Sequence, residues 1–266
     1  MRRLWLHNPK LEWDDPIPDE DHQNWANFFQ DLSKMEKIKV NRCTKPKEAT
    51  GNPILVIFSD GSNDAYGACA YARWRLLNGD HATNRILSKN RLAPSKKLSI
   101  DRIELCGAVL NKRLKTIITE QCRYRFEKCY HITDSQIVHS MIQKESYEFN
   151  TFAAVRIGEI QEGTNAKDWY WTASEFNIAD LLTRGSKPND ININSAWQMG
   201  PNFLQLHESE WPITNTYSEQ KVPINTIKLE LSSPAVQTNT EDTLASRINI
   251  EKYSDYKKLL RIKSQH

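Results

Sequence analysis

The chain has 266 residues, of which 39% are apolar and 26% are charged, and its formal net charge is +3. This length suits one large domain or two small ones, and the apolar fraction is sufficient for a hydrophobic core. The longest apolar runs, such as residues 54–58, are far too short to cross a bilayer. We therefore expect no membrane span and no membrane partner.

The first ten residues carry charge but lack the apolar segment of a signal peptide. The five cysteines form no CxxC pair, and an odd, scattered set of this kind is typical of reduced thiols. Together these features favour an intracellular protein, either cytoplasmic or nuclear.

Residues 1–50 are predicted to form a separate helical segment. An acidic, proline-rich stretch ends at Pro18, where a helix is expected to begin. Apolar side chains recur at i, i+3, i+4 and i+7 from Trp25 to Leu32, so this helix has one apolar face. A polar linker is expected over residues 41–53.

Three strands are predicted next. Residues 53–60 form a β-rich apolar run that is suited to burial on both faces. Residues 68–76 follow the turn sequence DGSNDAYG and are expected to pair with the first run in antiparallel fashion. Residues 82–92 form the third strand, which ends before Pro94.

A long helix is predicted after Ser99, its candidate N-cap, because apolar residues recur with helical period as far as Ile118. A last helix is expected to hold Asp180. The elements between these two helices are a strand, two helices and a strand, at residues 128–135, 136–144, 152–164 and 168–174. The order βββαβααβα predicts an α/β fold with a mixed five-stranded sheet and flanking helices.

After about Pro212 the sequence becomes polar and loses its periodicity, which indicates a linker or loose structure. Residues 248–263 regain apolar spacing and are predicted to form one basic amphipathic helix. The chain is thus expected to divide into a helical connection (1–50), a central domain (51–212) and a linker with a helix (213–266).

Four acids stand beside these apolar runs: Asp60, Glu104, Asp134 and Asp180. Carboxylates are costly to bury unless they are paired or bind a metal. The predicted sheet places Asp60 and Asp134 on neighbouring central strands, with Glu104 on the helix that packs across them. The four acids therefore suggest a divalent-metal site, and repulsion between them should raise carboxyl pKa values when no metal is bound.

Each acid also has an ordinary structural interpretation. A DGS sequence such as that at Asp60 is usually a turn. The pair Asp134-Ser135 and the residue Asn177 are possible helix N-caps, and Glu104 is a possible first-turn acid favoured by the helix dipole. The occurrence of all four acids in this order favours the metal site.

Residues 84–128 contain 12 lysines and arginines but only 4 acids. The simplest interpretation is a solvated helix face. Beside a carboxylate cluster, however, such a basic strip would attract a polyanion towards bound cations. Lys96, Lys97 and Arg102 are the candidates for phosphate contacts.

On this framework the chain resembles ribonuclease H, and more narrowly the ribonuclease H region of BEL/Pao-type LTR retrotransposon polyproteins, a region also classed as a Pao retrotransposon peptidase. The resemblance runs from about residue 5 to residue 213. It is carried by ILVIFSDGSNDAYGACAYARW, LAPSKKLSIDRIELCGAVL, YHITDSQIVHSMIQ, FAAVRIGEIQE, FNIADLLTRG and SAWQMGPNFL.

The resemblance implies an endonuclease that cuts the RNA strand of an RNA–DNA hybrid and leaves a 5′-phosphate and a 3′-hydroxyl. It implies two Mg²⁺ ions, or Mn²⁺, held by the four acids, with Asp60 bridging both ions. It also implies that Ser62 and Ser135 contact substrate. The expected partners are the hybrid and the reverse transcriptase and integrase segments of the same polyprotein.

Some features depart from the family pattern. Trp171 stands where the family often has His or Tyr, so a polar contact near the site is expected to be missing. His131 and His139 are not at that place, and we expect core or surface roles for them. The sequence contains no Y-x-D-D polymerase motif.

Two alternatives to an active nuclease remain. The first is an inactive retroelement relic that only binds nucleic acid. The second is an aspartic peptidase, but such enzymes use Asp-Thr/Ser-Gly with two carboxylates that share a proton. Here the order at Asp60 is Asp-Gly-Ser, and no second copy is present.

Overall fold

The computed structural model describes residue 4 and residues 10–36, 38–40 and 42–216. The helix predicted over residues 248–263 and nearly all of the predicted 213–266 segment lie outside these residues. Helix α2 spans Asp19–Met35 and begins after Pro18, as its sequence predicts, and none of its residues is buried.

The central feature is a six-stranded mixed sheet with the strand order β3-β2-β1-β4-β5-β6. Strands β1, β2 and β3 are antiparallel, β4 and β5 run parallel to β1, and β6 is antiparallel to β5. The strands span Ala49–Gly61, Ala65–Leu76, His81–Leu92, Cys129–Thr133, Trp169–Thr172 and Ile213–Thr214.

Two details of the predicted sheet are wrong. The sheet has a sixth strand, because Ile213 and Thr214 pair with the end of β5. The predicted linker over residues 41–53 also ends early, because β1 begins at Ala49, where Ala49 and Thr50 pair with the far end of β2. Both differences arise because distant segments of the chain pair as strands. The spacing of apolar residues within one segment does not predict which distant segment it pairs with.

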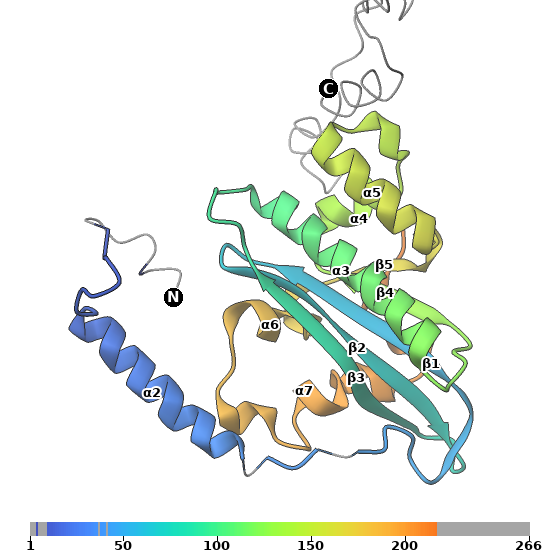
Figure 1. The fold of residues 1–266 in the computed structure, drawn as a ribbon. Helices are drawn as coiled ribbons and strands as arrows, with labels where there is room; N and C mark the ends of the chain where they lie inside the picture. The colour runs from blue at the N-terminus through green and yellow to red at the C-terminus, as the bar shows by residue number, and fades with distance from the viewer. Residues whose placement is uncertain (1–3, 5–9, 37, 41, 217–266) are drawn as a thin grey trace, which may run out of the picture. The chain divides into compact units, whose positions relative to one another are not determined.

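Three helices cover one face of the sheet, namely α3 (Ile100–Gln121), α4 (Gln136–Ile142) and α5 (Thr151–Gly163). Figure 1 shows α3 running along β1 and β2, with α5 beside it. Ser99 is the N-cap residue of α3 by position, but its side chain makes no capping hydrogen bond. The apolar face of α3 packs on the sheet through a buried cluster that contains Leu55, Ile57 and Leu114.

The opposite face is covered by α6 (Asp180–Arg184), α7 (Ala196–Met199) and the segment that follows them. Phe58 and Tyr71 of the sheet pack here against Phe203, in a second buried cluster. The buried Arg73 donates from Nε to the Leu204 carbonyl at 2.6 Å. This face of the sheet is therefore closed by residues that follow α7.

Short 3₁₀ turns complete the described fold, at Ser146–Glu148, Ala166–Asp168, Ser174–Phe176, Pro188–Ile191, Asn202–Gln205 and Glu208–Glu210. Among the described residues, no helix combines the length and apolar character that a membrane crossing requires. All five cysteines, which lie within this part of the chain, are free thiols.

Candidate active site

Asp60 and Asp134 leave the sheet side by side. β1 and β4 are parallel neighbours, and Ser59 pairs with Thr133 at the end of their ladder. Asp60 is the next residue of β1 and Asp134 is the first residue after β4. Because the carboxyl ends of parallel strands lie at one edge of a sheet, the strand pairing itself brings these two acids together, as the sequence predicts.

Glu104 reaches the same place because two glycines allow α3 to approach β1 closely. A Cβ atom on Gly61 would lie 2.6 Å from the backbone nitrogen of Glu104. A Cβ atom on Gly107 would lie 2.5 Å from the carbonyl oxygen of Asp60. No residue larger than glycine fits at either position without a backbone shift, so the helix carries Glu104 directly past the end of the strand.

Asn177 connects three parts of this edge. Its buried side chain donates to the Ser59 carbonyl at 3.0 Å and to Asp134 Oδ1 at 2.9 Å, and its Oδ1 accepts from the Ala179 N–H. Interpreting Asn177 as the helix N-cap is wrong, because the N-cap residue of α6 is Ala179. Sequence reasoning missed the positioning role of Asn177. The available signal was a polar residue three positions before Asp180.

Helix α6 supplies Asp180 and two residues that engage the acids. Thr183 Oγ1 donates a short hydrogen bond to Asp60 Oδ2, although the two residues are 123 positions apart in the chain. Arg184 Nε forms an ion pair with Asp180 Oδ1 at 2.5 Å. Asp180 is thus brought near Asp60, but its carboxylate is paired with its own helix.

The Asp60 carboxyl is buried, and this burial is the main reason that its pKa is raised. The hydrogen bond from Thr183 opposes the rise, while the charges of Asp134 and Asp180 add to it. Like charges held close disfavour joint ionisation, and Asp60 is the acid with which Asp134, Asp180 and Glu104 all interact.

Glu104 has a pKa raised to about 7, again mainly through burial. A hydrogen bond with the Ser135 side chain lowers it, and the charges of Asp134, Asp101 and Asp60 raise it. The pKa values of Asp60 and Glu104 are thus raised, as expected, but burial and not repulsion between the acids is the main cause.

The chemistry of the four acids suits Mg²⁺, which prefers oxygen ligands. As the side chains stand, however, no group of three Asp, Glu, His or Cys residues within the described part of the chain is arranged to hold a metal ion. Asp60 and Asp180 instead accept hydrogen bonds from Thr183 and Arg184. The metal assignment therefore stays a prediction.

The two candidate serines have structural contacts. Ser62 Oγ accepts from the N–H groups of Asp64 and Ala65, both at 3.2 Å, so the DGS sequence does form the turn between β1 and β2. Ser135 is the N-cap of α4 and accepts from the Val138 N–H at 3.2 Å. Their substrate contacts stay predictions.

The candidate basic residues lie in and after the connection between β3 and α3. Lys96 and Lys97 are exposed there. Arg102, in the first turn of α3, stacks over the ring of Phe152 from α5 at 4.9 Å. Their phosphate contacts also stay predictions.

Trp171 makes a polar contact despite its departure from the family pattern. Its indole Nε1 donates to the Asp134 carbonyl at 2.8 Å, which helps to fix the backbone beside that acid. His131 and His139 are both buried, with hydrogen bonds to Asn111 and to the Trp169 carbonyl respectively. The two histidines are thus core residues, in agreement with the sequence analysis.

An antiparallel β1–β2–β3 unit, two further strands parallel to β1, and acids at the carboxyl ends of β1 and β4 define a ribonuclease H-like domain. The chain belongs to the Pao retrotransposon-like RNaseH-like domain family, whose family model matches residues 1–135. The matched segment includes Asp60, Glu104 and Asp134 and ends before Asp180.

Among solved structures, the chain is similar to the N-terminal RNase H domain of Rv2228c from Mycobacterium tuberculosis, determined as a fusion with maltose binding protein. The identity is 12%, the similarity covers 50% of this chain and 91% of that chain, and the TM-score is 0.34. It is also similar to RNase H1 from Halobacterium salinarum NRC-1, with 10% identity, 47% and 84% coverage and a TM-score of 0.27. No curated protein matches the chain.

Proposed function

We propose that this chain is a retrotransposon-derived ribonuclease H that hydrolyses the RNA strand of RNA–DNA hybrids by a two-metal mechanism. The observation that carries the proposal is the meeting of Asp60, Glu104 and Asp134 where β1 ends, with Asp180 close enough to raise the Asp60 pKa. Four acids in one place are unfavourable for a folded protein, and binding of cations offsets that cost.

Two divalent ions, when bound, would polarise the phosphate, activate a water and stabilise the leaving oxygen. Asp60, which interacts with acids on both sides, would be shared by both ions. Asp180 would hold the ion on the side of the attacking water, and Glu104 with Asp134 would hold the ion beside the leaving 3′ oxygen.

The other residues of the site position these acids. Asn177 holds one oxygen of Asp134 with its amide, and Trp171 holds the carbonyl of the same residue. Glu104, with its pKa near 7, is partly protonated at neutral pH, and it must release that proton when it binds a cation. Binding of cations should therefore strengthen as pH rises through 7.

The test is cleavage of the labelled RNA strand of an RNA–DNA hybrid, in Mg²⁺ and in EDTA. Single-stranded RNA and DNA duplex of the same sequence serve as controls, because ribonuclease H chemistry depends on contacts to the 2′-hydroxyl within a duplex. We expect cleavage of the hybrid in Mg²⁺ only. Cleavage in EDTA, or equal cleavage of single-stranded RNA, would contradict the proposal.

An inactive relic that binds hybrid is the second candidate. The ion pair between Arg184 and Asp180 and the bond from Thr183 to Asp60 favour it, because both occupy carboxylates that the cations need. Binding of hybrid without cleavage at any Mg²⁺ or Mn²⁺ concentration would support this candidate. The peptidase alternative has no comparable support, because Asp60 stands in Asp-Gly-Ser and not in Asp-Thr/Ser-Gly, and the acids beside it come from separate elements.

A further inference from the structure

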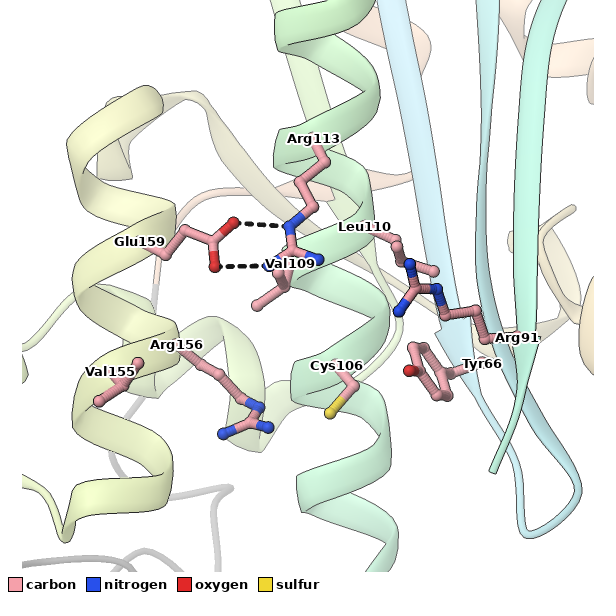
Figure 2. Close-up of a pocket in the computed structure, with 9 residues that line it drawn as sticks. All are labelled: Tyr66, Arg91, Cys106, Val109, Leu110, Arg113, Val155, Arg156 and Glu159. Carbon is pink, nitrogen blue, oxygen red and sulfur yellow. Dashed lines mark hydrogen bonds and ion pairs between the residues drawn. The ribbon is translucent and has the colours of Figure 1, made fainter. Parts of the chain in front are cut away.

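A cavity of about 230 Å³ lies on the outer surface of α3, between α5 and the paired strands β2 and β3. We call it the arginine groove, after Arg91 of β3, Arg113 of α3 and Arg156 of α5. Figure 2 shows Arg91 and Arg156 extending towards α3 from opposite sides. The remaining residues that line it are Tyr66, Cys106, Val109, Leu110, Val155 and Glu159.

The groove carries an excess of positive charge. Arg113 donates from Nε and Nη2 to the two carboxylate oxygens of Glu159, at 2.7 and 2.9 Å, which leaves its Nη1 for another acceptor. Arg156 stacks 3.6 Å from the ring centre of Phe152 and uses Nη1 on the carbonyl of that residue. Arg91 is exposed; the residue pairs with Tyr66 in the sheet, but its side chain has no hydrogen bond or ion pair within the described part of the chain. The residues that line the groove thus include three guanidinium groups and one carboxylate.

The groove lies close to Glu104 along the axis of α3 but on another side of the helix. Cys106 follows Glu104 by two residues and Arg113 by nine, which is about 3 to about 14 Å along α3 at a rise of 1.5 Å per residue, and at about 100° per residue both point away from the side that carries Glu104. On the sheet side, Tyr66 pairs with Gly61, the residue after Asp60. Successive phosphates of one strand advance by about 3.4 Å along the duplex axis, so a groove of about 10 Å corresponds to about three of them when that axis follows α3.

We propose that the arginine groove binds the phosphate backbone of a nucleic acid strand. Guanidinium groups match phosphate geometry with paired N–H donors, and arginines from three separate elements line this one groove. The groove is distinct from the sequence-predicted contacts at Lys96, Lys97 and Arg102. The identity of the polyanion as an RNA–DNA hybrid rests on the proposed function.

The test is binding of a fluorescent RNA–DNA hybrid of about 16 base pairs in EDTA, measured by anisotropy over a range of salt concentrations, so that no cleavage interferes. Arg91→Ala and Arg156→Ala should each weaken binding and reduce the salt slope by about 1, and the double variant should reduce it by about 2. Glu159→Gln removes the competing carboxylate and should tighten binding. Arg125→Ala, an exposed arginine beyond the end of α3, is the charge-matched control and should bind like the parent.

Arg91→Ala and Arg125→Ala both remove exposed side chains, so a difference between them is not a folding effect. Equal affinities for Arg91→Ala, Arg156→Ala and Arg125→Ala would overturn the inference. Polyglutamate of matched charge is the competitor. If it displaces the hybrid, and if Arg91→Ala and Arg156→Ala lose affinity for polyglutamate as they do for the hybrid, the inference is overturned and the groove is a site for an acidic peptide.

Failure of the inference and failure of the proposed function give different results. Normal Mg²⁺-dependent cleavage, with unchanged binding in the arginine variants, would refute the role of the groove and support the nuclease activity. Arginine-dependent binding of hybrid without cleavage in Mg²⁺ would refute the nuclease activity and support the role of the groove.

Discussion

In the folded chain, the surroundings of Asp60 and Glu104 disfavour the ionised forms of both carboxyl groups. Burial is the largest cause of the raised pKa in both, and neighbouring carboxylates add to it. Thr183 and Ser135 oppose the rise with hydrogen bonds. Single substitutions at these acids should therefore affect cation-dependent activity and metal-free stability in opposite directions.

Asp60→Asn should abolish hydrolysis and leave the fold intact. Asn retains the shape and an oxygen that accepts from Thr183, but it lacks the charge that two cations would share. The loss should be on the order of 3–4 kcal/mol, a rate drop of at least about 10²–10³, in the hybrid cleavage assay.

Without metal, the same Asp60→Asn variant should melt no lower than the parent, because it relieves repulsion among the acids, and it should still bind hybrid. Retained cleavage by this variant would remove the two-metal assignment.

Glu104→Gln should change the pH dependence of stability when metal is absent. A carboxyl whose pKa rises from 4.5 in the unfolded chain to about 7 in the folded chain binds more protons when folded. Its contribution is therefore fully present below pH 4.5 and is lost as the pH rises towards 7. The parent should lose stability over this interval, and the variant should lose less, so that their difference is larger at pH 8 than at pH 4.5. Urea unfolding in EDTA at both pH values measures the difference, and parallel pH profiles would contradict the assigned shift.

At the scale of elements, the contact between α3 and β1 decides whether Glu104 reaches Asp60. Gly107 lies in the interior of α3, where alanine normally favours a helix over glycine. Gly107 nevertheless faces the carbonyl of Asp60, and a Cβ atom added to it would lie 2.5 Å from that carbonyl oxygen. The close approach therefore outweighs helix propensity at this position.

Gly107→Ala should destabilise the fold by about 1–3 kcal/mol, as overpacking does, and should impair cleavage because α3 must move away from Asp60. Gly158→Ala is the matched control in the interior of α5, where the nearest atom to an added Cβ is Ser146 Oγ at 3.7 Å. It should stabilise by about 0.5–1 kcal/mol, since only helix propensity changes. Urea unfolding of both variants tests the pair, and equal effects would show that α3 does not depend on its glycine.

At the scale of the whole molecule, residues after α7 form part of the core. Phe203 contacts Phe58 of β1 and Trp211 of the same segment, with ring centres 6.2 and 5.9 Å apart. Arg73 holds the segment through the carbonyls of Leu204 and Leu206. The sheet is therefore closed on this face by sequence more than 140 residues after the start of β1.

Phe203→Ala should lower the free energy of unfolding by about 3–5 kcal/mol, because it empties a site among three aromatic rings where Phe203 is only 7% exposed. Phe28→Ala in α2 removes the same side chain where it is 51% exposed, and it should change stability by no more than about 0.5 kcal/mol. Chemical denaturation compares the two. A small effect at Phe203 would mean that the segment after α7 is not needed for the folded sheet.

The order of strands and helices and the four acids could be read from the sequence. Apolar runs and helical spacing are local properties, and they correctly predicted β1 to β5 and α2 to α6 apart from their ends. The pairing of β1 with β4, and with it the meeting of Asp60 and Asp134, followed from that order because a helix-linked strand returns parallel to its neighbour.

Other features were decided only by the tertiary structure. Asn177 donates to Asp134 across 43 residues, and Thr183 donates to Asp60 across 123. Neither hydrogen bond can therefore be recognised from a local pattern in the sequence. The same holds for β6 and for the arginine groove, whose three arginines come from three different elements. Sequence periodicity records which side of an element is apolar, whereas hydrogen bonds and charge clusters depend on which elements become neighbours, and that is set when the whole core packs.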